Sequence, residues 1–263
     1  MNVTPDSFSD GGRWLDPGAA VEQAFRLAAE GADLIDVGGE STRPGAPEVP
    51  EAEELRRVVP VLERLAAAGL PVPVSVDTSR ASVVRAAVNA GAAMVNDVRA
   101  LADPETARAV ADSGAPVVLM HMRGSPRDMR ERTGYRDLVG EVRAELAMAI
   151  GRAIAAGVRE DRIAIDPGLG FAKTPEQTTE VLARLAEFLS LGRPLYVGPS
   201  RKSFIGVITG APPADRLPGT LAAVTAAVLA GATFVRVHDV AAAVQAVRVA
   251  LALRDAGASP TNA

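Results

Sequence analysis

The chain repeats one pattern that constrains its fold more than any other feature. An alanine-rich stretch ends in glycine, and a short run rich in valine and isoleucine follows and ends in polar residues. Glycine just past a helix accepts the left-handed backbone conformation that closes the helix. These glycines recur about every 33 residues, which is the size of one βα unit. They are Gly31, Gly69, Gly91, Gly114, Gly157, Gly192 and Gly231.

The runs after these glycines are nearly all apolar, as strands buried on both faces of a parallel sheet should be. They cover residues 34–37, 72–76, 94–96, 117–121, 163–165, 195–197 and 234–237. A barrel of eight strands needs one more, and residues 1–3 are the only candidate. We therefore expect an α/β fold, a (β/α)8 TIM barrel, with its first strand truncated at the N-terminus.

Helices are expected in the intervals between the strands. One should cover residues 16–30, with Asp16 as its N-cap and Pro17 in its first turn. Another should cover residues 137–156 and be the longest. Because no linker or shift in composition divides the chain, we expect one barrel domain over residues 1–256 and a flexible tail over residues 257–263.

Composition excludes several classes of protein. No apolar run approaches the roughly 18 residues of a membrane span, and no signal peptide is recognisable. The absence of cysteine rules out disulfides and thiolate chemistry and fits a reducing cytoplasm, and two histidines cannot form an all-histidine metal site. A net charge of −4 and 3% aromatic residues give no footprint for nucleic acid. We expect a cytoplasmic protein without a membrane or nucleic-acid partner.

Polar side chains follow the predicted strands, at the end where parallel barrels build their sites. Asp77, Asn96 and Asp166 could line a pocket for a flat heterocycle with an N–H edge. In the alternative, the two aspartates cap the helices that follow. A full loop between Asp166 and the helix expected near Pro175 weakens that alternative, whereas for Asp77 both remain open. His121 is expected to be a buried histidine that supports the site.

Arg236 and His238 are two residues apart at the end of a strand, so they should share one face. Arginine offers a planar fork of donors that suits phosphate oxygens, and the pair therefore predicts an anion pocket. The alternative is a surface arginine beside a helix-capping His–Asp pair. Lys202 could contact a carbonyl or a phosphate, or lie in solvent.

The familiar catalytic motifs are absent from the sequence. It has no Ser–His–Asp order, no HExxH, no GxGxxG and no P-loop. Its polar residues favour electrostatic stabilisation of a leaving anion over nucleophilic catalysis. The residues alone predict a barrel enzyme that handles a phosphorylated small molecule.

Six peptides also carry a resemblance that covers nearly the whole chain. In their order and spacing they resemble the dihydropteroate synthases, the folate-pathway enzymes that sulfonamides inhibit. That family is a (β/α)8 barrel, usually a homodimer, and joins 6-hydroxymethyl-7,8-dihydropterin pyrophosphate to p-aminobenzoate. The peptides are NVTPDSFSDGG (2–12), DVGGESTRPGA (36–46), LMHM (119–122), DPGLGFAK (166–173), SRKSF (200–204) and RVHD (236–239).

The resemblance implies a role for each matching residue. The pterin would be bound by Asp77, Asn96, Asp166 and Lys202. The pyrophosphate would be bound by Arg236, His238 and Asn2, and Asn2 would also bind Mg2+. The p-aminobenzoate site would be bordered by Thr42, Arg43, Pro44, Phe171 and Ser203, and Asp6 and Phe8 would belong to loops that order when substrate binds.

The implied mechanism needs no general base. The C–O bond to pyrophosphate breaks first, and the amine of p-aminobenzoate then attacks the resulting pterin cation. Two alternatives are a pterin-binding methyltransferase and a non-catalytic pterin-binding paralogue. A methyltransferase has no need of the SRK cluster together with RVHD. A non-catalytic paralogue would be expected to lose residues of the anion site or the loops, and this chain retains Asn2, Arg43, Lys202, Arg236 and His238.

Overall fold

Short parallel strands form the inner layer of the molecule in the computed structural model, which describes Met1, Val3, residues 17–43 and residues 45–258. Five strands pair in chain order, and two more form a second pair that a bridge between Ile165 and Leu195 joins to the first sheet. The strands are β1 (Ile35–Gly38), β2 (Val74–Asp77), β3 (Met94–Asp97), β4 (Val117–Met120), β5 (Ile163–Asp166), β6 (Tyr196–Val197) and β7 (Phe234–Val235).

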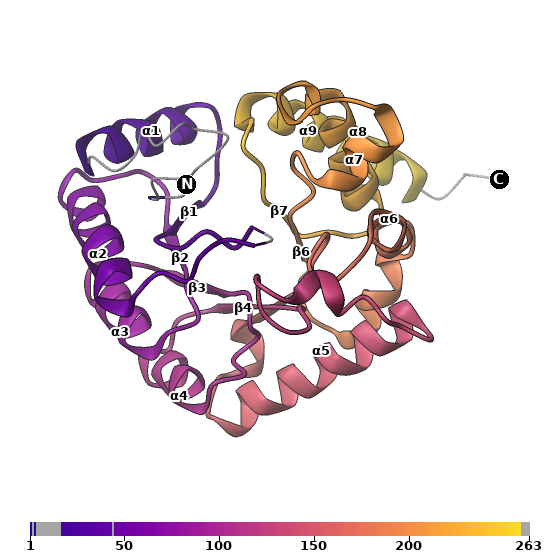
Figure 1. Cartoon of the computed structure of the whole chain (residues 1–263). Coiled ribbons are helices and arrows are strands. Elements are labelled where there is room, and N and C mark those ends of the chain that lie inside the picture. The colour runs from indigo at the N-terminus through magenta and orange to yellow at the C-terminus, as the bar shows by residue number, and fades with distance from the viewer. Residues whose placement is uncertain (2, 4–16, 44, 259–263) are drawn as a thin grey trace.

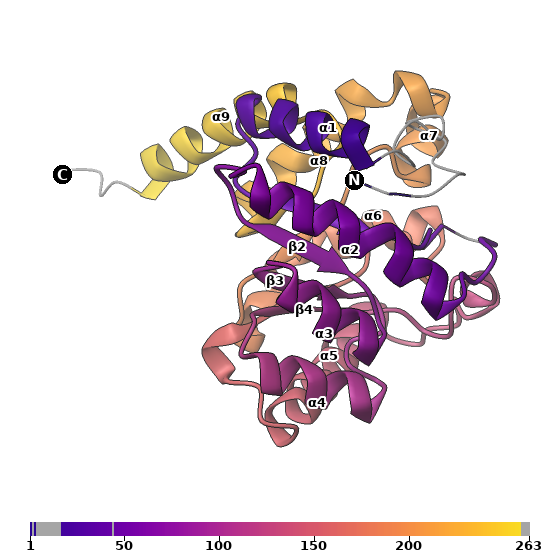
Figure 2. The same ribbon diagram turned by 90° about the vertical axis from the view of Figure 1, so that its left-hand side faces the viewer.

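Helices form the outer layer around these strands (Figure 1). Both views place α2, α3 and α4 on the outer side of β2, β3 and β4 (Figure 2). The helices are α1 (Pro17–Ala29), α2 (Glu51–Ala67), α3 (Ala81–Asn89), α4 (Pro104–Ser113), α5 (Leu138–Ala155), α6 (Pro175–Ala183), α7 (Ser203–Thr209), α8 (Leu217–Leu229) and α9 (Val240–Ala258). Short 3-10 helices are η1 (Met129–Glu131), η2 (Glu160–Arg162), η3 (Leu185–Leu191) and η4 (Pro213–Asp215).

Met1 and Val3 occupy the position beside β1 that the predicted first strand would take. Gly38 donates to the carbonyl of Met1 at 3.0 Å, and Val3 donates to the carbonyl of Gly38 at 2.8 Å. In a pair of parallel strands, one residue forms backbone hydrogen bonds with two different residues of the neighbouring strand, as Gly38 does here. The arrangement is therefore that of a (β/α)8 barrel, with seven strands assigned among the described residues.

The core lies between the strands and the inner faces of the helices. In α2 the buried apolar residues recur at helical spacing and form one stripe. The largest fully buried side chains include Leu62, Leu65, Leu119, Ile165, Phe188 and Leu195. None of the helices in the described ranges is both long and apolar enough to cross a membrane.

The predicted order of strands and helices is confirmed, and the predicted strand boundaries differ from the observed ones by at most two residues. All seven glycines named above have positive φ, between 65° and 104°. The prediction that the helix after residue 137 is the longest is wrong, since α5 has 18 residues and α9 has 19. Helix α9 reaches Ala258, two residues beyond the predicted end of the domain, while Asp16 and residues 259–263 lie outside the described ranges.

Candidate active site

Three of the expected site residues lie at the carboxyl ends of strands and are buried. Asp77 and Asn96 are direct partners in the register of β2 and β3, and Asp166 ends β5. Neither aspartate caps the next helix, because Arg80 occupies the N-cap position of α3 and Thr174 caps α6. The capping alternative is therefore wrong for both. What remains is a set of buried hydrogen-bonding groups at the carboxyl ends of the strands.

Arg236 joins two of these strand ends through its guanidinium. Its Nε donates to Asp36 Oδ2 at 2.7 Å, and its Nη2 lies 3.6 Å from Asp77 Oδ2. Ser75 Oγ donates to the other carboxylate oxygen of Asp36 at 2.6 Å. Arg236 is therefore not an isolated surface arginine. Its half-buried guanidinium and the buried carboxyl groups of Asp36 and Asp77 form an ion group that spans β1, β2 and the residue after β7.

The two carboxyl groups beside Arg236 differ in their charge. Burial raises the pKa of Asp77 to about 7, the charge of Asp36 adds to the shift, and Arg236 opposes it. Burial acts in the same direction on Asp36, but Arg236 and the Ser75 hydroxyl hold the pKa of Asp36 below its ordinary value. Asp36 is thus the fixed counter-ion of Arg236, while Asp77 can titrate near neutral pH.

Lys202 and Asp166 influence each other's charge at this end of the barrel. Burial raises the pKa of Asp166 to about 6, while the Gly168 N–H, which donates to Asp166 Oδ1 at 2.7 Å, and Lys202 oppose the shift. Burial lowers the pKa of Lys202 to about 8, and Asp166 and Asp77 oppose that shift. The Lys202 Nζ lies 4.2 Å from the centre of the Phe171 ring, a cation–π distance. Lys202 is therefore directed into the site, not into solvent.

His238 and Arg236 border one cavity of about 380 Å³, which lies between β1 and β7 and is also lined by Asp36 and Tyr196. The His238 Nδ1 lies 2.8 Å from Ser200 Oγ. His238 as a whole is exposed, but partial burial of its ring, with Arg236 nearby, lowers the pKa of His238 to about 3, so the ring is neutral at pH 7. A Ser200 hydroxyl that donates to Nδ1 leaves the ring proton on Nε2, where it can meet a ligand.

The loops that carry SRKSF and RVHD are fastened to each other. Arg201 binds both carboxylate oxygens of Asp239, at 3.1 Å from Nε and 2.7 Å from Nη2. Arg201 has a φ of +55°, and its N–H donates to Thr220 Oγ1 at 3.0 Å. A two-point contact of this kind fixes orientation as well as distance. It holds Lys202 and His238, which follow and precede these residues, on adjacent loops.

The residues expected around p-aminobenzoate are less enclosed. Thr42 lines a cleft together with Asp77 and Arg80, Arg43 is half-buried, and Ser203 is exposed at the start of α7. The remaining expected residues lie outside the described ranges: Asn2, Asp6, Phe8 and Pro44.

Known proteins resemble the chain over nearly its full length. The family model "Pterin binding enzyme" matches residues 1–238. The dihydropteroate synthase of Synechocystis sp. is 48% identical over 255 residues, which cover 96% of this chain and 88% of the relative. The chain belongs to the dihydropteroate synthase family.

Solved structures of dihydropteroate synthases share the barrel. A Yersinia pestis dihydropteroate synthase in a sulfonamide drug complex aligns with a TM-score of 0.94 at 45% identity, covering 97% of this chain and 92% of that one. The Xanthomonas albilineans dihydropteroate synthase with 4-aminobenzoic acid aligns with a TM-score of 0.89 at 50% identity, covering 98% and 92%. This dihydropteroate synthase family member is accordingly a transferase with a TIM-barrel fold.

The structure adds residues that the sequence did not single out. Asp36, which binds Arg236, sits inside a quoted peptide, and its position at the end of a predicted strand was the available signal. Ser200 was visible only as part of a polar cluster. Lys173 and Glu145 could not have been found, because they meet His121 across 52 and 24 residues of sequence.

Proposed function

We propose that the described residues bind a dihydropterin pyrophosphate and p-aminobenzoate and join them into 7,8-dihydropteroate with loss of pyrophosphate. One observation carries this proposal: buried hydrogen-bonding groups on β2, β3 and β5 lie in the same charged cluster as Lys202 and Arg236. The buried hydrogen-bonding groups suit a flat ring, and the two cations suit the negative charge of departing pyrophosphate.

The pterin ring is proposed to lie against Asp77, Asn96 and Asp166, with Lys202 at its carbonyl. An ionised carboxylate can accept two hydrogen bonds from an N–H and NH2 edge, and such charge-assisted bonds are the strong ones. Bound in this way, the aspartates also favour a ring that becomes cationic.

Arg236 and His238 are proposed to act on the leaving group. The C–O bond breaks, its electron pair leaves with pyrophosphate, and the positive charge spreads over the pterin ring. Arg236 contributes a permanent charge that Asp36 holds in place, and neutral His238 contributes an N–H from Nε2. Donors fixed in advance toward developing charge usually make the largest contribution to such catalysis.

The amine of p-aminobenzoate then attacks the methylene carbon and loses a proton. It is already nucleophilic, so the protein has only to orient it. Thr42, Arg43, Pro44, Phe171 and Ser203 are proposed to border it. Asp6 and Phe8 are proposed to belong to loops that close over both substrates.

Mg2+ is proposed as the metal, with Asn2 and pyrophosphate oxygens as ligands. Within the described ranges no three His, Asp or Glu side chains gather to hold an ion. Mg2+ is commonly bound through one or two protein groups and substrate phosphates. When bound, it would neutralise part of the charge of pyrophosphate.

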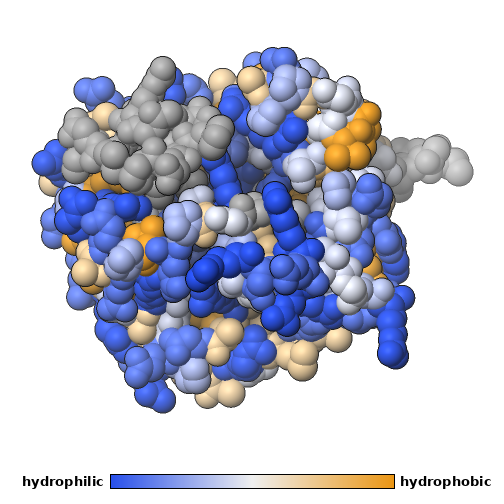
Figure 3. Space-filling model, in the orientation of Figure 1, coloured by the Kyte–Doolittle hydropathy of each residue, from blue (hydrophilic) through white to orange (hydrophobic). Residues whose placement is uncertain are grey.

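The organisation of the protein completes the proposal. We propose a single barrel domain over residues 1–256, a homodimer, and a cytoplasmic location. Val207 and Ile208 on α7 are large apolar side chains that are exposed. Figure 3 shows one apolar patch, in orange, at the upper right of the face drawn there. Sedimentation at several concentrations would test the dimer directly.

Product analysis tests the proposed reaction. The protein is mixed with 6-hydroxymethyl-7,8-dihydropterin pyrophosphate, p-aminobenzoate and Mg2+, and 7,8-dihydropteroate is sought by chromatography and mass. We expect that product only when both substrates are present. A protein that binds pterin in calorimetry yet forms no product would instead be a non-catalytic paralogue.

A further inference from the structure

Lysine occurs at only two positions in this chain, Lys173 and Lys202, against 26 arginines. Both lie at the same end of the barrel, and Lys173 is buried while Lys202 is half-buried. Every other permanently basic side chain of the protein is an arginine, so lysine occurs only at this end of the barrel. Lys202 has a place in the proposed reaction, whereas Lys173 has none so far.

Lys173 sits behind the pocket with three acceptors around its Nζ. It donates to the carbonyl oxygens of Gly168 at 3.2 Å and of Phe171 at 3.1 Å, and it lies 2.9 Å from His121 Nδ1. An ammonium has three donors in a tetrahedral arrangement, so these partners use its full capacity. A guanidinium presents its donors in a flat fork and cannot serve three acceptors that converge on one atom.

His121 connects Lys173 to helix α5. Because Nδ1 accepts from the ammonium, the ring proton lies on Nε2, which is 3.0 Å from Glu145 Oε2. Burial and the nearby Lys173 lower the pKa of His121 to about 4, so the ring stays neutral. Burial also lowers the pKa of Lys173 to about 7, while Asp166 and Glu145 oppose that shift, so the Lys173 side chain is an ammonium below about pH 7. The chain of contacts Glu145–His121–Lys173 therefore has one consistent direction of hydrogen bonding.

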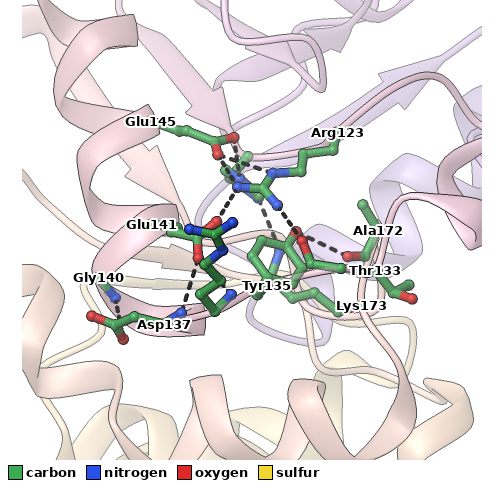
Figure 4. A network of polar contacts seen from close by, with 12 residues as sticks. Arg123, Thr133, Tyr135, Asp137, Gly140, Glu141, Glu145, Ala172 and Lys173 are labelled. Carbon is green, nitrogen blue, oxygen red and sulfur yellow. Dashed lines mark hydrogen bonds and ion pairs between the residues drawn. The ribbon is translucent and has the colours of Figure 1, made fainter.

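Glu145 is itself held from the other side, as Figure 4 shows. Arg123 Nε donates to Glu145 Oε1 at 2.9 Å, and Arg123 Nη2 donates to Glu141 Oε2 at 2.7 Å. The guanidinium carbon stands 4.0 Å from the centre of the Tyr135 ring, and the Tyr135 hydroxyl donates to the carbonyl of Ala172 at 2.9 Å. The same network thus reaches the 168–172 turn at a further carbonyl.

That turn needs external support. Gly168 and Gly170 have φ of +69° and +75°, and Ala172 has φ of +48°, which costs energy for a residue with a side chain. The Gly168 carbonyl accepts from Phe171 N as well as from Lys173. Asp166 lies just before the turn, and the ring of Phe171, in the turn, faces Lys202.

We propose that Lys173 is a positioning residue for the pterin site: its ammonium, oriented by His121 and Glu145, holds the 168–171 turn so that Asp166 and Phe171 face the pocket. This inference rests on the proposed function, because the pterin is the ligand that the turn would serve. It predicts that an ammonium is required at residue 173 and that a positive charge alone does not suffice.

The first test examines the network without any substrate. Protein labelled with nitrogen-15 lysine should give two side-chain signals, which Lys173→Met and Lys202→Met assign. We expect slow exchange of the Lys173 ammonium protons with water, and a shift of that signal in Glu145→Gln while the Lys202 signal stays in place. Rapid exchange, or a Lys173 signal indifferent to Glu145→Gln, would overturn the proposed network.

The second test measures pterin binding by calorimetry on variants matched for thermal stability. Lys173→Met should weaken binding about tenfold or more, as expected for lost bonds to a charged group. Lys173→Arg should fail to restore it, and Arg159→Met, which removes an exposed surface charge, should leave it unchanged. If Lys173→Met does not fold, Lys173→Arg and Glu145→Gln serve as the test instead, and each is expected to bind pterin more weakly than the parent.

Parent-like binding by Lys173→Arg would contradict the proposal. If the parent protein fails to bind pterin, the proposed function is refuted. The NMR signals of the lysine side chains would still show whether the contacts among Lys173, His121 and Glu145 exist.

Discussion

Asp36 and Asp77 lie on neighbouring strands and share one guanidinium, yet the pKa values of their carboxyl groups are displaced in opposite directions. The difference arises from their partners: Arg236 and the Ser75 hydroxyl bind Asp36, whereas Asp77 is buried beside the charge of Asp36 and farther from Arg236. Asp36 has Arg236 Nε at 2.7 Å, while Asp77 has only a 3.6 Å contact with Arg236 Nη2. The site therefore keeps one acidic group fully engaged and leaves another available to a ligand.

Asp166→Asn should separate stability from binding. Because the pKa of Asp166 is raised from 3.8 to about 6, the folded state binds more protons than the unfolded state between these pH values. The parent therefore loses stability as pH rises through that window, by about 3 kcal/mol. Asparagine cannot ionise, so the variant should be more stable than the parent above about pH 7 and similar near pH 4.

Urea unfolding at several pH values measures this difference, and calorimetry on the same variant measures pterin binding. Binding should weaken by about 1.5–3 kcal/mol through loss of a charge-assisted bond. A variant with lower stability at neutral pH and normal affinity would show that the carboxylate serves the fold and not the ligand.

Arg236→Ala should lower turnover by about two to three orders of magnitude, the usual effect of removing a donor to developing charge. Affinity for a pterin without pyrophosphate should change much less. Since the variant leaves Asp36 buried without its partner, Arg236→Ala/Asp36→Asn serves as the control for charge balance. Steady-state kinetics measures the loss of turnover, and calorimetry measures the loss of pterin affinity. Equal losses would mean that Arg236 binds the pterin ring and does not act on the leaving group.

Among the elements, the strands and their order were predictable because glycine and short apolar runs mark them locally. The polar residues at strand ends were predictable for the same reason, and Asp77, Asn96 and Asp166 were found in this way. Contacts that depend on packing were not. Nothing near Lys173 in the sequence indicates that its Nζ meets His121.

Gly168→Ala tests how firmly the 166–173 loop is built. A Cβ at residue 168 would lie 2.0 Å from the carbonyl oxygen of His121, and φ is +69°. Both effects oppose a side chain, and we expect a loss of about 3 kcal/mol or more in the free energy of unfolding. Gly151→Ala, on the exposed side of α5 with open space around it, should gain roughly 0.5–1 kcal/mol. Thermal unfolding of both variants gives the comparison, and a neutral Gly168→Ala would mean that the loop can move.

At the scale of the whole molecule, the repeated βα pattern predicted the barrel, and six peptides in order predicted the family. Neither could give the charge states within the site, because pKa values depend on burial and on partners from distant segments. Arg236 and Asp36 are 200 residues apart in the sequence, and only the curved arrangement of the strands brings the Arg236 Nε to 2.7 Å from Asp36 Oδ2.

Sulfonamide inhibition should follow from the p-aminobenzoate site. Sulfonamides mimic p-aminobenzoate and extend beyond it, and the loop at residues 40–49 has neither an insertion nor an added aromatic residue to block the excess. We expect sulfamethoxazole to inhibit turnover competitively with p-aminobenzoate at micromolar concentrations. No inhibition at millimolar drug would mean that this loop shields the site.

The central claim is tested most directly by counting pyrophosphate and 7,8-dihydropteroate in one reaction. Released pyrophosphate is measured with dihydropterin pyrophosphate and Mg2+, with and without p-aminobenzoate, for the parent and for Arg236→Ala. We predict one dihydropteroate for each pyrophosphate when both substrates are present, and a rate that falls sharply in Arg236→Ala. Absence of dihydropteroate, or equal rates in the two proteins, would contradict the assignment of this barrel end as the synthase site.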